Sequence, residues 1–299
     1  MTRRLLTPLV AVVLIAASLA AQSKPSAEQL LDLMGAYLVD YESQLSSVVA
    51  DERFIQRVVY TRAYTDGVPE IGRMPSESDL RTNDEQRRLE SEIGFIRLPG
   101  GSVWLGFRDV RRINGREVAR GAQSVSDLLA SGADVMTKAR AIAEASAAHN
   151  LGSPRTTNVP TAALEIIHPR NFAAHQFELR GEDTVRRTRV AVIGFTEVRR
   201  PPLVTNLAGK ELVSRGRIWV DPSTGAIWRV EWIYAPAVGV PSSLRVEFGT
   251  HDKLGMLVPL EMREEFRSFG GLDARGSGVA YYTNFRRFST GARMIPQLP

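Results

Sequence analysis

The sequence contains no cysteine among its 299 residues. The chain therefore cannot form a disulfide, bind a metal ion through thiolates, use a thiolate nucleophile or carry a lipid on an N-terminal cysteine. Its fold has to be held by a hydrophobic core instead. A hydrophobic content of 43% is ordinary for a globular protein, and the chain is long enough to bury such a core.

Motifs for catalysis and metal binding are also absent. The sequence has no Gly-x-Ser-x-Gly, Ser-x-x-Lys, Walker or His-Glu-x-x-His motif. Glu165, His168 and His175 lie near one another in the sequence, but a zinc site needs three or four converging ligands. We therefore expect structural or solvated histidines, no metal ion, no cofactor and no enzyme activity.

After the first 20 residues, no stretch is apolar enough to cross a membrane. Residues 1–20 hold two arginines, an apolar stretch at 9–17 and a small-x-small sequence at 18–20, which is typical of a cleaved signal peptide. We therefore expect a periplasmic or secreted chain with no integral membrane span after cleavage. Export argues against a nucleic-acid partner, and the net charge of +5 is too small to indicate polyanion binding.

The order of predicted elements indicates the fold class. Ser26 and Gln29 form a capping box for a helix over 27–46, and Asn114-Gly115 is a strong hairpin signal. We expect further helices at 124–130, 134–149 and 162–167, and a loop at 62–85. The expected strands are 48–61, 89–98, 103–113, 173–180, 185–197, 211–220, 226–235, 242–251, 257–268 and 277–288.

This order predicts an α+β fold with a curved antiparallel β-sheet, an open half-barrel. The N-terminal helix and the short helices are expected to pack on its concave face. We expect one domain over residues 21–299, in which lid-like helices end near residue 172 and an antiparallel meander fills 173–290.

Residues 216–234 are predicted to form two strands joined by a turn, and they hold three of the four tryptophans. The intervening Asp-Pro-Ser-Thr-Gly sequence has turn chemistry. Alternation along this and the following strands places Arg–Glu pairs on one face and apolar side chains on the other. We call the apolar set the apolar cradle; it comprises Trp228, Val230, Trp232, Tyr234, Leu244, Val246 and Phe248.

The apolar cradle has two interpretations. It is either ordinary core beneath the helices, which is the commoner arrangement, or a partly open pocket that the short helices cover and that suits an acyl chain. The arginines at Arg186, Arg187 and Arg189 are likewise either a solvated basic surface or a contact with lipid headgroups or a partner.

Two resemblances bear on these interpretations. The hairpin at 216–231, with its Asp-Pro-x-Thr-Gly turn and following Arg-x-Glu, is similar to a segment of the lipoprotein-localisation carriers (LolA/LolB-like), and the element order resembles theirs. The resemblance implies an unclosed β-barrel around a hydrophobic cavity with a helical lid. The sequence has no clear counterpart of the ligand-gating arginine of those carriers.

The chain more closely resembles an uncharacterised family of exported bacterial proteins over nearly its whole mature length. This family has no assigned activity, so the resemblance implies no catalytic residues. The segments that carry it are VADER (49–53), WLGFRDV (104–110), NLG (150–152), NVP (158–160) and YTNFRRF (282–288).

Three hypotheses for function follow. The first is a non-enzymatic periplasmic protein that binds a lipid, a lipid-modified protein or another apolar ligand in the sheet concavity. The alternative is an envelope scaffold or protein-interaction module with a filled core. The third is an enzyme whose site is assembled from distant residues, for instance Arg108, Asp109 and a histidine.

Overall fold

The computed structural model describes most of the chain from residue 25 onward. The expected signal peptide, residues 1–20, and nearly all of the expected helix at 124–130 lie outside the described residues. Within the described part, no helix combines the length and apolar character needed to span a membrane. The described residues are 25–63, 80–97, 104–118, 125, 135–152, 155, 157–205, 209, 211–236, 241–268, 274–289 and 293–294.

The strands form one antiparallel sheet, which confirms the predicted fold class. The described strands follow the order β4-β3-β2-β1-β12-β11-β10-β9-β8-β6-β5, with β13 paired to β12 and β7 to β8, so the described sheet is not closed. Its strands are β1 (Val48–Ala63), β2 (Leu80–Arg97), β3 (Trp104–Ile113), β4 (Arg116–Glu117), β5 (His175–Val185), β6 (Thr188–Glu197), β7 (Val204–Thr205), β8 (Glu211–Val220), β9 (Ile227–Pro236), β10 (Ser242–His251), β11 (Met256–Ser268), β12 (Ala274–Ser289) and β13 (Arg293–Met294).

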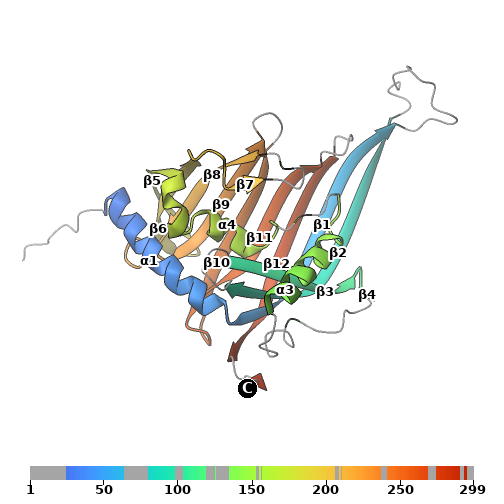
Figure 1. Cartoon of the computed structure of the whole chain (residues 1–299), viewed down its shortest axis with the longest axis horizontal. Coiled ribbons are helices and arrows are strands. Elements are labelled where there is room, and N and C mark those ends of the chain that lie inside the picture. The colour runs from blue at the N-terminus through green and yellow to red at the C-terminus, as the bar shows by residue number, and fades with distance from the viewer. Residues whose placement is uncertain are drawn as a thin grey trace, which may run out of the picture.

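The predicted meander matches β8 to β12 closely, because alternating side chains and short turns mark each strand. The strands predicted at 173–180 and 185–197 have wrong inner bounds, since β5 continues to Val185 and the turn falls at Arg186 and Arg187. The first hairpin is longer than predicted. β1 continues to Ala63 and β2 begins at Leu80, where a loop over 62–85 was expected. β1 also pairs with β12, so the first strand lies beside the last long one (Figure 1).

Helix α1 (Ala27–Leu45) covers the concave face of the sheet. Its predicted capping box is present, with Ser26 and Gln29 each bonding the backbone of the other. The buried side chains of α1 join those of β6 and β8 to β12 in one continuous cluster, the main core. Helix α4 (Pro160–Ile166) adds Ala163 and Leu164 to the same cluster. Figure 1 shows α1 lying across the strands.

Helix α3 (Val135–Ala147) lies on the other face, which differs from the expected packing. Gly106 and Phe107 are neighbours on β3 and so point to opposite faces. A Cβ built on Gly106 would lie 2.7 Å from Thr161 of α4, whereas Phe107 packs with Ala139 of α3 in a separate cluster. The sheet is therefore covered by α1 and α4 on one face and by α3 at one end of the other.

Charged side chains pair along the solvent-facing side of the meander, as predicted. Arg229 lies 3.0 Å from Glu247, and Arg217 lies 2.6 Å from Glu231. These residues sit on adjacent strands, so the pairs cross from strand to strand.

Candidate functional site

The residues of the apolar cradle lie in the main core. Val230, Trp232, Leu244, Val246 and Phe248 are all at most 2% exposed. Leu244 pairs with Trp232, and Val246 pairs with Val230, across β9 and β10. Their cluster includes the buried face of α1, so the chain's own helix covers the cradle in this structure.

Trp228 and Tyr234 are only partly buried. The Tyr234 ring contacts the Trp232 ring in a tilted arrangement, with ring centroids 4.5 Å apart. Trp228 sits at a β-bulge, because Trp219 pairs with Arg229 while Val220 pairs with Ile227. The bulge turns Ile227 into the main core, although alternation predicted that it faces away, and Trp228 also contacts an outer cluster that includes Trp219.

Several polar side-chain atoms on α1, α4 and the sheet are buried without a hydrogen-bond partner among the described residues. Tyr37 stacks on Tyr41 with centroids 5.3 Å apart, and Tyr41 meets Trp104 edge-on at 5.9 Å. Burial raises the pKa of both tyrosines, so both hydroxyls keep their protons at neutral pH. The unpartnered atoms are Tyr37 Oη, Tyr41 Oη, Trp104 Nε1, Thr161 Oγ1 and Trp232 Nε1.

Such atoms are uncommon in a native interior, where most buried polar side-chain atoms have a partner. Leaving one unpaired costs about 1–3 kcal/mol. We call these five atoms, with the apolar cradle around them, the covered site. Its chemistry is that of an apolar surface carrying a few hydroxyl and N–H donors.

A charged cluster joins α1 to α4 and to the short helix η2 (Pro169–Ala174) at the edge of the covered site. Arg170 donates to Glu42 at 2.5 Å, and His168 Nε2 lies 3.6 Å from the same carboxylate. Arg170 also lies 3.6 Å from Glu165, which accepts a 3.2 Å bond from the Trp104 backbone N–H. Burial outweighs these contacts and raises the pKa of Glu165 to about 6.

A second polar network lies inside the fold, between β1, β3 and the segment after α3. Arg108 donates to Glu52 at 2.8 Å and to the Asn158 carbonyl at 2.8 Å, and both charged side chains are at most 3% exposed. Gln56 on β1 donates to Asn150 at 2.6 Å. These bonds attach Asn150 and Asn158 to the sheet.

A second buried pair extends this network. Arg155 lies 2.8 Å from Glu264 and stacks over Phe266, with its guanidinium 3.5 Å from the ring centroid. The network members have partners, so we assign the network a structural role. Sequence reasoning missed it, because the pairing joins residues far apart in the chain. Glu52 and Arg108 do lie within the VADER and WLGFRDV segments.

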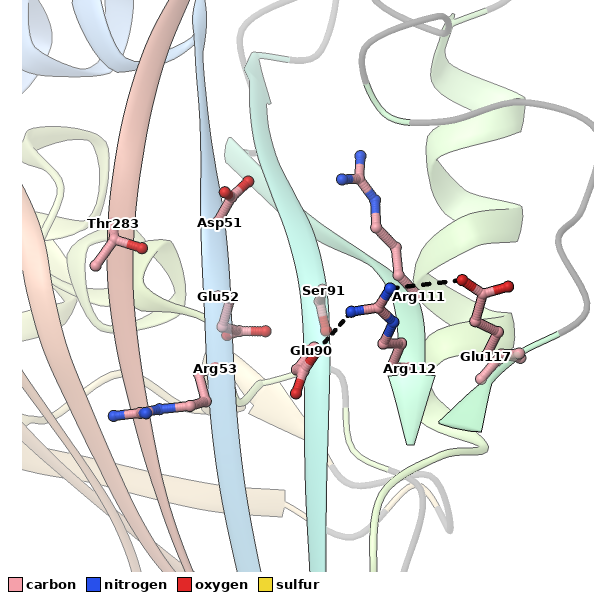
Figure 2. A pocket seen from close by; sticks show the side chains of 10 residues that line it. Asp51, Glu52, Arg53, Glu90, Ser91, Arg111, Arg112, Glu117 and Thr283 are labelled. Atoms are coloured by element: carbon pink, nitrogen blue, oxygen red, sulfur yellow. Dashed lines mark ion pairs between the residues drawn. The ribbon is translucent and has the colours of Figure 1, made fainter. Parts of the chain in front are cut away.

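An open depression of about 1000 Å³ lies along β1, β2 and β3. Figure 2 shows Arg112 reaching toward Glu90 and Glu117, at 3.7 and 3.5 Å. The buried hydroxyl of Ser91 has no partner among the described residues. The depression is lined by Asp51, Glu52, Arg53, Glu90, Ser91, Arg111, Arg112, Glu117, Val118 and Thr283.

A β-bulge shapes this depression. Glu90 pairs with Arg112, whereas Ser91 pairs with Val110, which leaves Arg111 as the extra residue of β3. Arg111 lies 2.7 Å from Glu92, while the two ion pairs of Arg112 are longer than hydrogen bonds. With walls of both charge signs, the depression suits a polar partner and not an acyl chain.

The arginine cluster lies at the hairpin between β5 and β6. Val185 pairs with Thr188, so Arg186 and Arg187 form a two-residue turn, with φ of 48° and 70°. Both are exposed, and neither has an ion-pair partner within the described chain. Positive φ at both positions normally calls for Asn-Gly. Arg189 bonds to Glu182 across the hairpin.

The residues considered for an enzyme site or a metal site do not meet in one place. Arg108 points into the core toward Glu52, whereas Asp109 follows it on β3 and so points to the other face. His168 and His175 contact Arg170 and the Asn171 carbonyl. Within the described residues, no group of three or more histidine, aspartate and glutamate side chains could hold a metal ion.

Comparisons with known proteins find similar solved structures, but no matching family model or curated protein. Neither the protein-family models nor the curated proteins include a match to this chain. A DUF1329 family protein from Desulfovibrio piger is 14% identical, with 89% of this chain and 94% of that chain covered and a TM-score of 0.33. A putative outer membrane lipoprotein-sorting protein domain from Vibrio parahaemolyticus is 8% identical, with 87% and 94% covered and a TM-score of 0.34.

A LolA superfamily protein from Nitrosomonas europaea is also similar. It is 12% identical, with 85% of this chain and 94% of that chain covered, at a TM-score of 0.29. The structures found thus include the superfamily that the sequence resembles. At these TM-scores we draw no functional conclusion from the likeness, and the fold class rests on the described strands.

Proposed function

We propose that the protein is an exported, non-enzymatic binding protein that takes an amphiphilic ligand, a lipid or a lipid-modified chain, in the covered site. The observation that carries the proposal is the set of five unpartnered polar atoms on α1, α4 and the sheet, among the apolar side chains of the main core. A ligand with an apolar body and ester, amide or carboxylate oxygens would satisfy both parts of that surface.

The position of α1 supports a model in which a ligand takes the place of this helix. α1 belongs to no strand ladder, so it can move away without breaking a backbone bond of the sheet. A ligand that replaced it would bury the same apolar side chains, at roughly 25 cal/mol for each Å² removed from water. The indole N–H groups of Trp104 and Trp232 and the Thr161 hydroxyl, which do not belong to α1, would then gain partners that α1 does not offer.

Tryptophan quenching by brominated acyl chains tests the site directly. Trp104 and Trp232 lie in the main core, whereas Trp219 lies in the outer cluster. The variant W219F should therefore show a larger quenched fraction than the unaltered protein, and W104F/W232F a smaller one. Equal quenching in both variants, or none in the unaltered protein, would contradict binding in the covered site.

Cargo can be identified separately, by native mass spectrometry and lipid extraction of the mature protein purified from the envelope. A bound mass that yields an acyl lipid supports the proposal. A ligand-free mass, together with no uptake of fluorescent fatty acids, argues for a filled core.

A second candidate function is contact with an envelope protein through the depression of Figure 2. The unpartnered Ser91 hydroxyl and the loosely paired Arg112 favour it. A photo-crosslinking residue in place of Thr283 should give one discrete adduct that R112E removes. The same residue in place of Arg57, exposed further along β1, is the matched control and should give none.

A further inference from the structure

Strand β5 ends the described sheet and presents a free edge. It pairs with β6 on one side, and no described strand pairs with its other side. Gln176 and all residues from Glu178 to Thr184 are exposed. Leu179, at 41%, is one of three large hydrophobic side chains that are exposed among the described residues.

We propose that β5 pairs with β5 of a second copy of this chain, antiparallel, about a two-fold axis that passes through Leu179. A two-fold axis makes the same strand serve as both partners, which is the commonest symmetry of protein dimers. The pairing would continue the sheet from one copy into the other.

The charges of β5 fit an axis at Leu179. With the axis at Leu179, residue Glu178 of each copy lies opposite Arg180 of the other, and Leu179 lies opposite itself. An axis at Glu178 or at Arg180 would instead oppose two glutamates or two arginines, which is unfavourable. Glu178 and Arg180 already share a face, since they form a 2.9 Å ion pair and Arg180 covers Gly194.

The same features protect the edge from other strands. β5 carries a bulge between Leu179 and Gly181 and a run of exposed charges, which are the usual means of preventing random edge pairing. A strand without the complementary charges is repelled, whereas a second copy supplies them. The edge is therefore selective for its own sequence.

A cysteine scan gives a direct test, because the natural chain has no cysteine. Directly opposed residues of an antiparallel pair have Cα atoms roughly 4.5–5.5 Å apart, within reach of a disulfide. On mild oxidation, L179C should cross-link to itself. E178C and R180C should each cross-link poorly alone and efficiently when mixed. R187C at the hairpin tip is the control and should stay monomeric.

Charge exchange tests the same register without a covalent bond. Sedimentation velocity should show a dimer for the mature protein, and E178R or R180E alone should weaken it by about tenfold or more. The double variant E178R/R180E should restore the dimer. A monomer at all concentrations, L179C that fails to cross-link, or single variants that dimerise normally would overturn the proposal.

Discussion

Arg108 and Glu52 are a charged pair in an interior otherwise dominated by apolar contacts. Both are buried, and their contacts with Asn158 and the Phe54 ring fix the guanidinium on three sides. Desolvation makes such a pair a weak source of stability, yet removing one partner leaves a buried charge uncompensated. The value of the pair lies in attaching Asn158 to the sheet.

R108M should therefore lower the free energy of unfolding by about 3–5 kcal/mol, because Glu52 is left buried and unpaired. The double variant E52M/R108M should recover at least half of that loss. R57M is the matched control, since Arg57 lies on the same strand as Glu52 but pairs with Asp84 in solvent, and it should change stability little. Urea unfolding of the three variants measures these free energies, and a loss in R57M as large as that in R108M would contradict the prediction.

Glu165 predicts a pH dependence. Burial raises its pKa from an ordinary 4.5 to about 6, so the folded protein holds this proton more tightly than the unfolded chain does. The contribution of Glu165 to the free energy of unfolding therefore increases as the pH falls through 6 towards 4.5, by at most about 2 kcal/mol.

Two other groups act in the opposite direction. Burial lowers the pKa of His175 and His149, so both cost stability as the pH falls. E165Q isolates the glutamate: the urea midpoint of the unaltered protein minus that of E165Q should rise as the pH falls from about 7.5 to 5. A constant difference would contradict a raised pKa.

At the scale of residues, the sequence predicted the face of the sheet on which a side chain lies better than the residue that it contacts. Val230 and Trp232 point into the core as alternation predicts, because strand side chains alternate. Ile227 and Trp228 depart from the alternation at a bulge, which no local pattern announces. The pairing of Glu52 with Arg108 depends on the register of β1, β2 and β3, and register is a property of the assembled sheet.

Helix α1 is seated on the turn between β8 and β9. Gly225 has a φ of 74°, and a Cβ there would lie 2.2 Å from the Leu33 carbonyl oxygen of α1. The glycine thus serves two purposes: it closes the turn and admits the helix backbone.

G225A should therefore displace α1 as well as strain the turn. Gly115 provides a control, since its φ is 81° but a Cβ there would meet nothing nearer than 3.9 Å. G115A should cost about 1–2 kcal/mol from backbone strain alone, and G225A should cost more. Hydrogen exchange should show faster exchange across residues 27–45 in G225A and not in G115A.

Elements were easier to predict than their packing. The capping box at Ser26 and the meander strands from β8 to β12 are confirmed, since local chemistry determines them. The side on which α3 packs was not foreseen. An apolar stripe shows which face of a helix is buried, but not which face of a sheet it covers.

At the scale of the whole molecule, the arginine turn at Arg186 and Arg187 combines exposure with backbone strain. We keep the prediction that this turn contacts anionic headgroups. R186N/R187G should raise the free energy of unfolding by roughly 1–2 kcal/mol, because Asn-Gly suits a turn with two positive φ angles. The same variant should bind anionic vesicles on the order of tenfold less, since each arginine near such a surface contributes about 1 kcal/mol.

R116E/R215E is the control for vesicle binding, since both arginines are exposed and lie outside the turn. It lowers the net charge further than R186N/R187G does. If the control variant loses vesicle binding as fully as the turn variant, overall charge and not the turn is responsible.

The pairing of β1 with β12 has a consequence for synthesis. Asp51 and Arg286 bond across 235 positions of sequence. At roughly 5–20 residues per second, a ribosome completes β12 roughly 10–50 s after β1. During that interval β1 has one neighbour, β2, and an open edge. The sheet therefore cannot be completed until the last long strand is made.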